Sequence, residues 1–189
     1  MSVLLSNLFL RIQDIILKPA TFWKIQKENK LKTRNLFPGY LIPLILIAGI
    51  AVFIGEFFRS NHFYAGFALL KAAREILLFL LQYVLAVFFT SYLMKTFGGK
   101  KNRDAARELV VFSLTPFLLV SVVTGLFPFL YVLDALGLYS FYIFWTGARE
   151  LLGFPQRQFE KYALTTILMN FFIFSFLSIL LSKLLTAYL

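Results

Sequence analysis

The chain has 189 residues, of which 60% are hydrophobic and 15% are charged, and its formal net charge is +10. A water-soluble domain carries about 45–50% apolar residues, so this composition excludes an ordinary soluble fold and predicts a membrane protein. The sequence has no Cys and one His, His62, which excludes disulfides, thiolate metal sites and multi-histidine metal sites, and we expect no metal or cofactor.

The first predicted element is an amphipathic helix over residues 3–17, in which Leu8, Ile12 and Ile15 recur at three- and four-residue spacing. A helix of this length is too short to cross a hydrocarbon core of about 30 Å. It either lies in the membrane interface or docks on the other helices, and the sequence leaves both placements open. Pro19 then interrupts the helix, and residues 20–34 combine basic side chains with Trp23. That combination is typical of a cytoplasmic interfacial anchor.

The long apolar runs divide the chain into a lead-in, residues 1–37, and a transmembrane domain, residues 38–189. Residues 109–147 carry one formal charge, Asp134, and are too long for a single span, because about 20 residues suffice. Residues 125–128 contain Gly and Pro and predict a tight hairpin inside this run. The expected fold is therefore all-α and polytopic, with an N-terminal amphipathic helix and five transmembrane helices at about 38–58, 75–94, 108–125, 129–147 and 162–182.

Positive charge gathers on alternate gaps between the predicted spans, with fifteen Lys and Arg on one side and four on the other. This bias predicts a cytoplasmic N-terminus and a C-terminus outside. We interpret the charge as attraction to anionic lipid headgroups, and we expect no nucleic-acid binding. The fifteen are Arg11, Lys18, Lys24, Lys27, Lys30, Lys32, Arg34, Lys95, Lys100, Lys101, Arg103, Arg107, Arg149, Arg157 and Lys161; the four are Arg59, Lys71, Arg74 and Lys183.

Two amides lie near the middle of predicted spans: Gln82 in the second and Asn170 in the fifth. An amide at that depth needs a partner. The pair is either a polar site between the helices or a simple interhelical hydrogen bond. In the first span, Ala51 and Gly55 form a small-xxx-small pair, which permits close approach of another helix.

A set of charged residues is expected near the outer face of the membrane, all at about the same depth. It consists of Glu56, Arg59, Arg74, Glu75 and Asp134. Because opposite charges stabilise each other in a low-dielectric environment, we expect Asp134 to pair with Arg74 or Arg59. The alternative is that each side chain reaches water separately.

Motifs of soluble enzymes are missing from the sequence. It contains no phosphate-binding Gly-rich loop, no His-Glu-x-x-His and no Gly-x-Ser-x-Gly. The spans supply almost no carboxylate at depth that could act as a general base. We therefore predict that the protein is not an enzyme and has no catalytic residues.

Several short motifs carry a family resemblance. Pro-Ala-Thr-Phe-Trp-Lys-Ile at 19–25 is followed by Glu28, by Tyr-Leu-Ile-Pro-Leu at 40–44 and by Phe-Ile-Gly at 53–55, and Phe-Ser-Leu-Thr-Pro at 112–116 precedes Phe-Pro at 127–128. Over about residues 10–185 this pattern resembles bacterial members of the YIP1 family, in which a basic, Trp-containing lead-in precedes five membrane helices. The resemblance implies an integral protein of the bacterial inner membrane with a cytosolic N-terminus. The Asp-Leu-Tyr-Gly-Pro segment of eukaryotic relatives, which contact Rab-type GTPases, is absent, so no binding role is carried over.

Two functional hypotheses follow. The first is a non-enzymatic membrane protein of YIP1 type that organises membrane or binds a partner, with a homodimer also compatible with the sequence. The alternative is a small transporter or lipid-handling protein with a polar path lined by Gln82, Asn170 and Asp134. A hydrated cavity that reaches these residues favours the second hypothesis, whereas buried, paired and dry side chains favour the first.

Overall fold

The computed structural model describes residues 2–29, 36–59 and 63–187, and within these ranges the regular structure is helical, with no strand. Five of the described helical stretches are long and apolar enough to cross a membrane, and each contains one of the predicted spans. The all-α, polytopic prediction is therefore confirmed. The stretches are Phe37–Arg59, Ala65–Thr96, Arg103–Leu126, Pro128–Leu151 and Gln156–Ala187.

The second and fifth stretches, α4 (Ala65–Thr96) and α8 (Gln156–Ala187), are each one helix, longer at both ends than predicted. At its first end α4 includes Lys71 and Arg74, which the prediction assigned to a connection. Their charges are compatible with the helix because both side chains form ion pairs there. The first stretch starts with a short π-helix, η2 (Phe37–Leu41), and continues as α3 (Ile42–Arg59).

The third and fourth stretches are each built from two segments. The third consists of α5 (Arg103–Ser113) and α6 (Thr115–Leu126), and Asn102 caps α5 by accepting hydrogen bonds from two backbone amides at 3.1 Å. Pro116 in the first turn of α6 lacks an N–H, which explains the interruption there. The fourth consists of a 3₁₀ segment, η3 (Pro128–Leu138), and α7 (Tyr139–Leu151). Between the two stretches Phe127 leaves helical geometry (φ −124°, ψ 80°), so the chain turns within the predicted 125–128 cluster.

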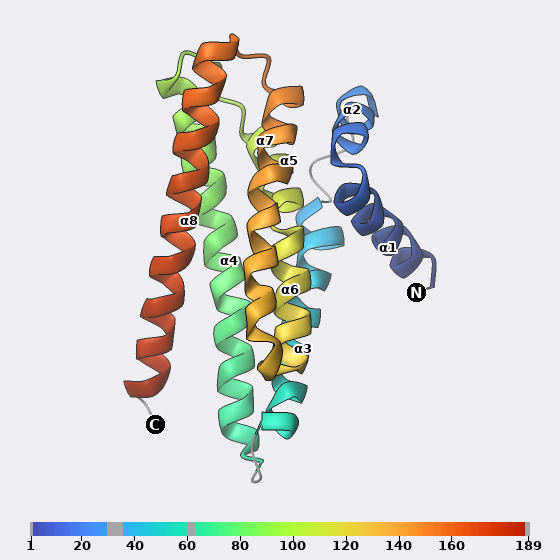
Figure 1. Ribbon diagram of the computed structural model, residues 1–189, viewed down its shortest axis with the longest axis vertical. Helices are drawn as coiled ribbons and strands as arrows, with labels where there is room; N and C mark the ends of the chain where they lie inside the picture. Colours follow the sequence, from blue (N-terminus) through green and yellow to red (C-terminus); the bar gives the residue numbers. More distant parts are fainter. Residues whose placement is uncertain (1, 30–35, 60–62, 188–189) are drawn as a thin grey trace.

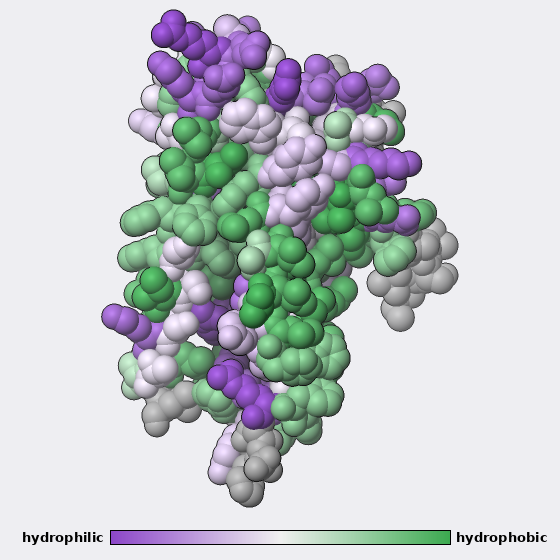
Figure 2. Space-filling view, viewed as in Figure 1, coloured by the Kyte–Doolittle hydropathy of each residue, from purple (hydrophilic) through white to green (hydrophobic). Residues whose placement is uncertain are grey.

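The helices form an elongated bundle with two distinct ends (Figure 1). The connections 97–102 and 152–155 lie at one end, close to α2 (Pro19–Asn29), and the turn between α6 and η3 and the end of α8 lie at the other. We call the first the basic end and the second the far end. Hydrophilic side chains gather at the basic end, and the middle of the bundle is mainly hydrophobic (Figure 2).

The N-terminal helix α1 (Ser2–Leu17) contacts α2 and, through its last turns, the bundle. Ile15 is fully buried, and the Tyr139 hydroxyl donates a hydrogen bond to the Ile16 carbonyl at 3.0 Å. The side chains of Phe9, Leu10 and Leu17 remain exposed. The helix therefore has one apolar face against the bundle and further apolar side chains directed away from it.

The main hydrophobic core lies toward the basic end, around Trp23 of α2. The Trp23 side chain is fully buried, and its indole Nε1 donates to the Ile143 carbonyl of α7 at 3.1 Å. Its ring packs edge-on against Phe22 and Phe112, with centroids 5.5 and 5.6 Å away. These contacts fix α2 against α5 and α7, so the predicted interfacial anchor is also a packing element.

Candidate functional site

A cavity of about 720 Å³ opens near the far end between α3, α4, α6, η3 and α8. Its floor, toward the middle of the bundle, is apolar and includes Leu78, Phe79, Phe117 and Phe174. Its rim holds most of the charged residues of that end, and we call it the charged cavity. In Figure 2 hydrophilic atoms are set back between hydrophobic surfaces in the corresponding lower half. The charged rim residues are Glu56, Arg59, Lys71, Arg74, Glu75 and Asp134.

On one wall of the charged cavity, Glu56 of α3 is 8% exposed and accepts a 2.6 Å hydrogen bond from Lys71 Nζ of α4. Lys71 Nζ also lies 4.4 Å from the centroid of the Phe67 ring, a cation–π contact. Arg59 Nη1 lies 3.7 Å from the same Glu56 oxygen, but 58% of the Arg59 side chain is exposed. Lys71 is therefore the main partner of Glu56, and the Arg59 guanidinium remains largely accessible.

On the opposite wall, Arg74 connects α4 to α8. Its Nη1 lies 3.1 Å from Glu75 Oε2, and its Nη2 donates to the Ser178 carbonyl and hydroxyl at 3.0 Å and to Ser182 Oγ at 2.8 Å. The other Glu75 oxygen accepts a 2.7 Å hydrogen bond from Ser121 of α6. Charge-assisted hydrogen bonds of this kind are stronger than neutral ones. They hold three helices around the cavity.

The predicted pairing of Asp134 with Arg74 or Arg59 is wrong. Arg74 pairs with Glu75 and Arg59 with Glu56, whereas Asp134 is exposed at the rim and forms no ion pair with the described residues. Equal depth in the membrane does not set the direction in which a side chain leaves its helix. Asp134 lies on the 3₁₀ segment η3, while the two carboxylates that pair with the arginines lie on α3 and α4.

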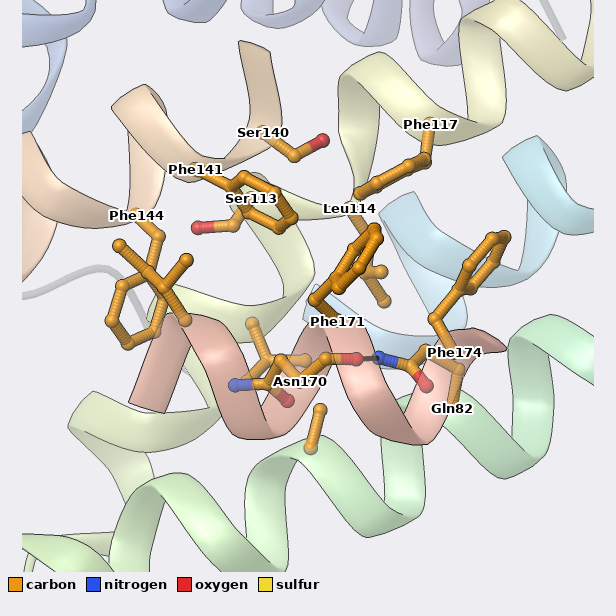
Figure 3. A pocket seen from close by; sticks show the side chains of 13 residues that line it. Gln82, Ser113, Leu114, Phe117, Ser140, Phe141, Phe144, Asn170, Phe171 and Phe174 are labelled. Atoms are coloured by element: carbon orange, nitrogen blue, oxygen red, sulfur yellow. Dashed lines mark hydrogen bonds between the residues drawn. The ribbon is translucent and has the colours of Figure 1, made fainter. Parts of the chain in front are cut away.

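The two mid-span amides meet at a second, smaller cavity of about 40 Å³, which we call the polar pocket (Figure 3). Gln82 Nε2 donates to the backbone carbonyl of Asn170 at 3.2 Å, and Asn170 Nδ2 donates to the Thr166 carbonyl at 2.9 Å. Both amide oxygens are buried without a hydrogen-bond partner among the described residues. The structure therefore brings the predicted pair together but leaves both side-chain oxygens unused.

Two serines contribute to the polar pocket and were not predicted as site residues. Ser113 ends α5 and Ser140 lies in the first turn of α7, and both hydroxyls are buried without a partner in the described part of the chain. Ser113 belongs to the 112–116 motif, but a single Ser in an apolar run carries no signal of its own. Lys71 was not predicted as a site residue either, because the sequence places it in the connection before the second predicted span.

Within the residues that the structure describes, no group of three or more His, Cys, Asp or Glu side chains comes together. The acids of the charged cavity are distributed over three elements, α3, α4 and η3. Glu56 and Glu75 each have a basic partner. The site thus combines balanced charge with an apolar floor.

Comparison with known proteins gives one finding. The Yip1 domain family matches residues 14–179, from the last turn of α1 to a point within α8. No curated protein and no solved structure matches the chain. The match starts within the lead-in, covers four of the five membrane-length stretches and continues into the fifth. It spans well over half of the chain, which therefore belongs to the YIP1 family.

Proposed function

We propose that this YIP1-family protein is a non-enzymatic, lipid-handling membrane protein that binds a zwitterionic phospholipid in the charged cavity. The observation that carries the proposal is the change from a charged rim to a phenylalanine-lined floor along one cavity. A phospholipid in the leaflet around the far end also changes from polar to apolar along its length. Its headgroup lies at the membrane surface, and its acyl chains extend toward the middle of the bilayer.

The size of the charged cavity supports this proposal. Ligand sites in proteins have volumes of roughly 300–1,000 Å³, and the cavity has about 720 Å³. That volume accommodates a headgroup and the first part of its acyl chains. The remaining chain length would extend between the helices into the surrounding lipid.

The charges of the rim favour a zwitterionic headgroup over a net anionic one. Asp134 has no ion pair with the described residues and could accept an ammonium group, and Arg59 is largely exposed and could bind a phosphate. The formal charges of the rim cancel, so a net anion would gain little overall attraction. The three basic residues are Arg59, Lys71 and Arg74, and the three acidic residues are Glu56, Glu75 and Asp134.

A binding role is favoured over catalysis by the state of the buried acids. A general base must be free to contact its substrate. Glu56 accepts from Lys71 at 2.6 Å, and Glu75 contacts both Arg74 and Ser121. Both carboxylates are therefore already engaged by neighbouring side chains.

The lipid proposal is tested by measuring the lipids that copurify with the protein from native membranes. In the double variant Arg59→Gln/Asp134→Asn, we expect the amount of bound zwitterionic phospholipid per protein to fall several-fold. Lys183→Gln is the matched control, because Lys183 is an exposed residue beside Ser182 that does not line the cavity. If the double variant retains the lipid content of the control, the charged cavity is not the lipid site.

We also propose that the basic end faces the cytoplasm of a bacterial inner membrane, where anionic headgroups would contact Lys24 and Lys27 of α2. The distribution of fifteen basic residues against four supports this orientation. Alkaline phosphatase fused after residue 189 should then be active, since this enzyme folds only outside the cytoplasm. A fluorescent protein fused after the same residue should stay dark, and the reverse pattern would refute the orientation.

A further inference from the structure

The polar pocket contains four buried oxygen atoms that no described residue satisfies: Gln82 Oε1, Asn170 Oδ1, Ser113 Oγ and Ser140 Oγ. Gln82 and Ser140 are 3% exposed and Ser113 is 7% exposed. Leaving one buried polar group without a partner costs about 1–3 kcal/mol. Four such groups from four helices around one cavity indicate that something occupies it.

The orientation of the two amides is determined by their neighbours. Each amide nitrogen donates to a backbone carbonyl of α8, that of Asn170 or Thr166. Turning either amide over would bring two oxygens together and lose the hydrogen bond. The amide oxygens therefore remain the free groups, and they can only accept hydrogen bonds, whereas the Ser113 and Ser140 hydroxyls can donate or accept.

We propose that the polar pocket binds small, neutral, hydrogen-bonding molecules, with water as the first occupant. Such a molecule donates to the Gln82 and Asn170 oxygens and accepts from the Ser113 and Ser140 hydroxyls. The volume of about 40 Å³ holds about three water molecules at roughly 10–15 Å³ each. No charged side chain lines the pocket among the described residues, which disfavours an ion, because an unpaired buried charge is far more costly than a neutral group.

The route into the pocket is given by two phenylalanines. Phe117 and Phe174 line both the polar pocket and the floor of the charged cavity, and their rings stack with centroids 5.0 Å apart. Figure 3 shows phenyl rings surrounding the serines and amides. Small molecules would therefore pass from the charged cavity between these two rings. This inference does not depend on whether a lipid occupies the charged cavity.

The occupant can be detected by X-ray radiolytic labelling, because hydroxyl radicals formed from bound water oxidise the nearest side chains. Phe144 lines the pocket and is 4% exposed, whereas Phe112 is fully buried against Trp23 and lines neither cavity. We expect Phe144 to be oxidised several times faster than Phe112, with incorporation of ¹⁸O from labelled water. Equal and negligible oxidation of the two residues would show that the pocket is dry and overturn the proposal.

The assignment to these oxygens is tested by removing the two hydroxyls. In Ser113→Ala/Ser140→Ala, the water loses its donors, and we expect oxidation of Phe144 to fall several-fold. Ser91→Ala is the matched control, since Ser91 is also a buried serine with an unpartnered hydroxyl but does not line the pocket. If the double variant and the control behave alike, the serines do not hold the occupant. Ser140→Ala alone repeats the test should the double variant fail to fold.

The route is tested with cysteine substitutions, which have no background because the chain has no native Cys. A small methanethiosulfonate reagent should modify Ser140→Cys slowly, and about tenfold faster when Phe117→Ala is added, since only a hydrated thiol forms the reactive thiolate. Phe172→Cys is the control, because Phe172 is exposed within the membrane-length stretch of α8 and would face lipid rather than water. Its modification should stay slow in both backgrounds. An unchanged rate for Ser140→Cys would place the entrance elsewhere.

Discussion

The two halves of the bundle are held together by different kinds of contact. Toward the basic end, Trp23, Tyr40 and Phe112 are buried and interlock α2, η2 and α5. Toward the far end, the helices surround the charged cavity, and ion pairs and serine hydroxyls connect them there. The comparison indicates that the aromatic side chains hold the basic half together, whereas the far half retains an open cavity.

The first prediction tests the role of the basic half and has the largest expected effect. Trp23→Ala removes a fully buried indole and its hydrogen bond to the Ile143 carbonyl. Large-to-small substitutions of buried aromatic residues cost about 3–5 kcal/mol. We expect a loss of this size in the free energy of unfolding, measured by denaturant titration in detergent micelles.

Phe9→Ala is the control for this prediction, because Phe9 is a large aromatic side chain of the lead-in that is 66% exposed. Its substitution should leave the free energy of unfolding almost unchanged. A small effect of Trp23→Ala, similar to that of Phe9→Ala, would mean that α2 does not stabilise the basic half.

The second prediction concerns the contact of α3 with α6 next to the charged cavity. A Cβ at Gly55 would collide with the backbone carbonyl of Gly125, so the two helices meet there backbone to backbone. Gly55→Ala forces them apart, and overpacking of this kind costs about 1–3 kcal/mol. Unfolding in the same micelles measures the loss. Gly66→Ala serves as the control, because a Cβ at Gly66 meets nothing within 4 Å, and equal stability of the two variants would contradict the close contact.

The third prediction has the smallest expected effect and concerns the attachment of α8 in the far half. Arg74→Gln removes the ion pair with Glu75 and most of the hydrogen bonds to Ser178 and Ser182, although the new amide keeps a donor. We expect a loss of about 1 kcal/mol, because the ion pair is partly exposed and the new amide retains some of the hydrogen bonding. Lys183→Gln removes a nearby exposed charge and should have no effect. A loss larger than that of Trp23→Ala would reverse the comparison of the two halves.

The helices themselves follow from local sequence. The apolar runs are long enough to predict each span, and the turn at Phe127 follows from the adjacent Gly125 and Pro128, whose effects on the backbone are local. Lys71 and Arg74 were placed outside the second span because a charge in a helix near lipid is unfavourable when considered alone. The ion pairs that make it favourable involve Glu56 of another helix and Glu75 of the same one.

The candidate sites were predicted only in part, for a geometric reason. Gln82 and Asn170 could be matched because both are amides near mid-span, and such groups need partners wherever they face. The partner of Asp134 could not be predicted, because the depth of a residue in the membrane does not determine the side of the helix from which its side chain projects. Ser113 and Ser140 could not be recognised at all, since a serine in an apolar run has no pattern until neighbouring helices enclose it.

Four features follow from local sequence patterns: the all-α membrane class, the number of spans, the tight turn between the third and fourth, and the separation of basic charge onto one end. These features depend on the composition and order of neighbouring residues, which act over one helix or one turn. Other features appear only once the helices are packed together: the contact of the last turns of α1 with the bundle, the pairing of the charges, and the sharing of Phe117 and Phe174 by two cavities. These features depend on the rotation and tilt of each helix against its neighbours, and packing between distant segments sets both.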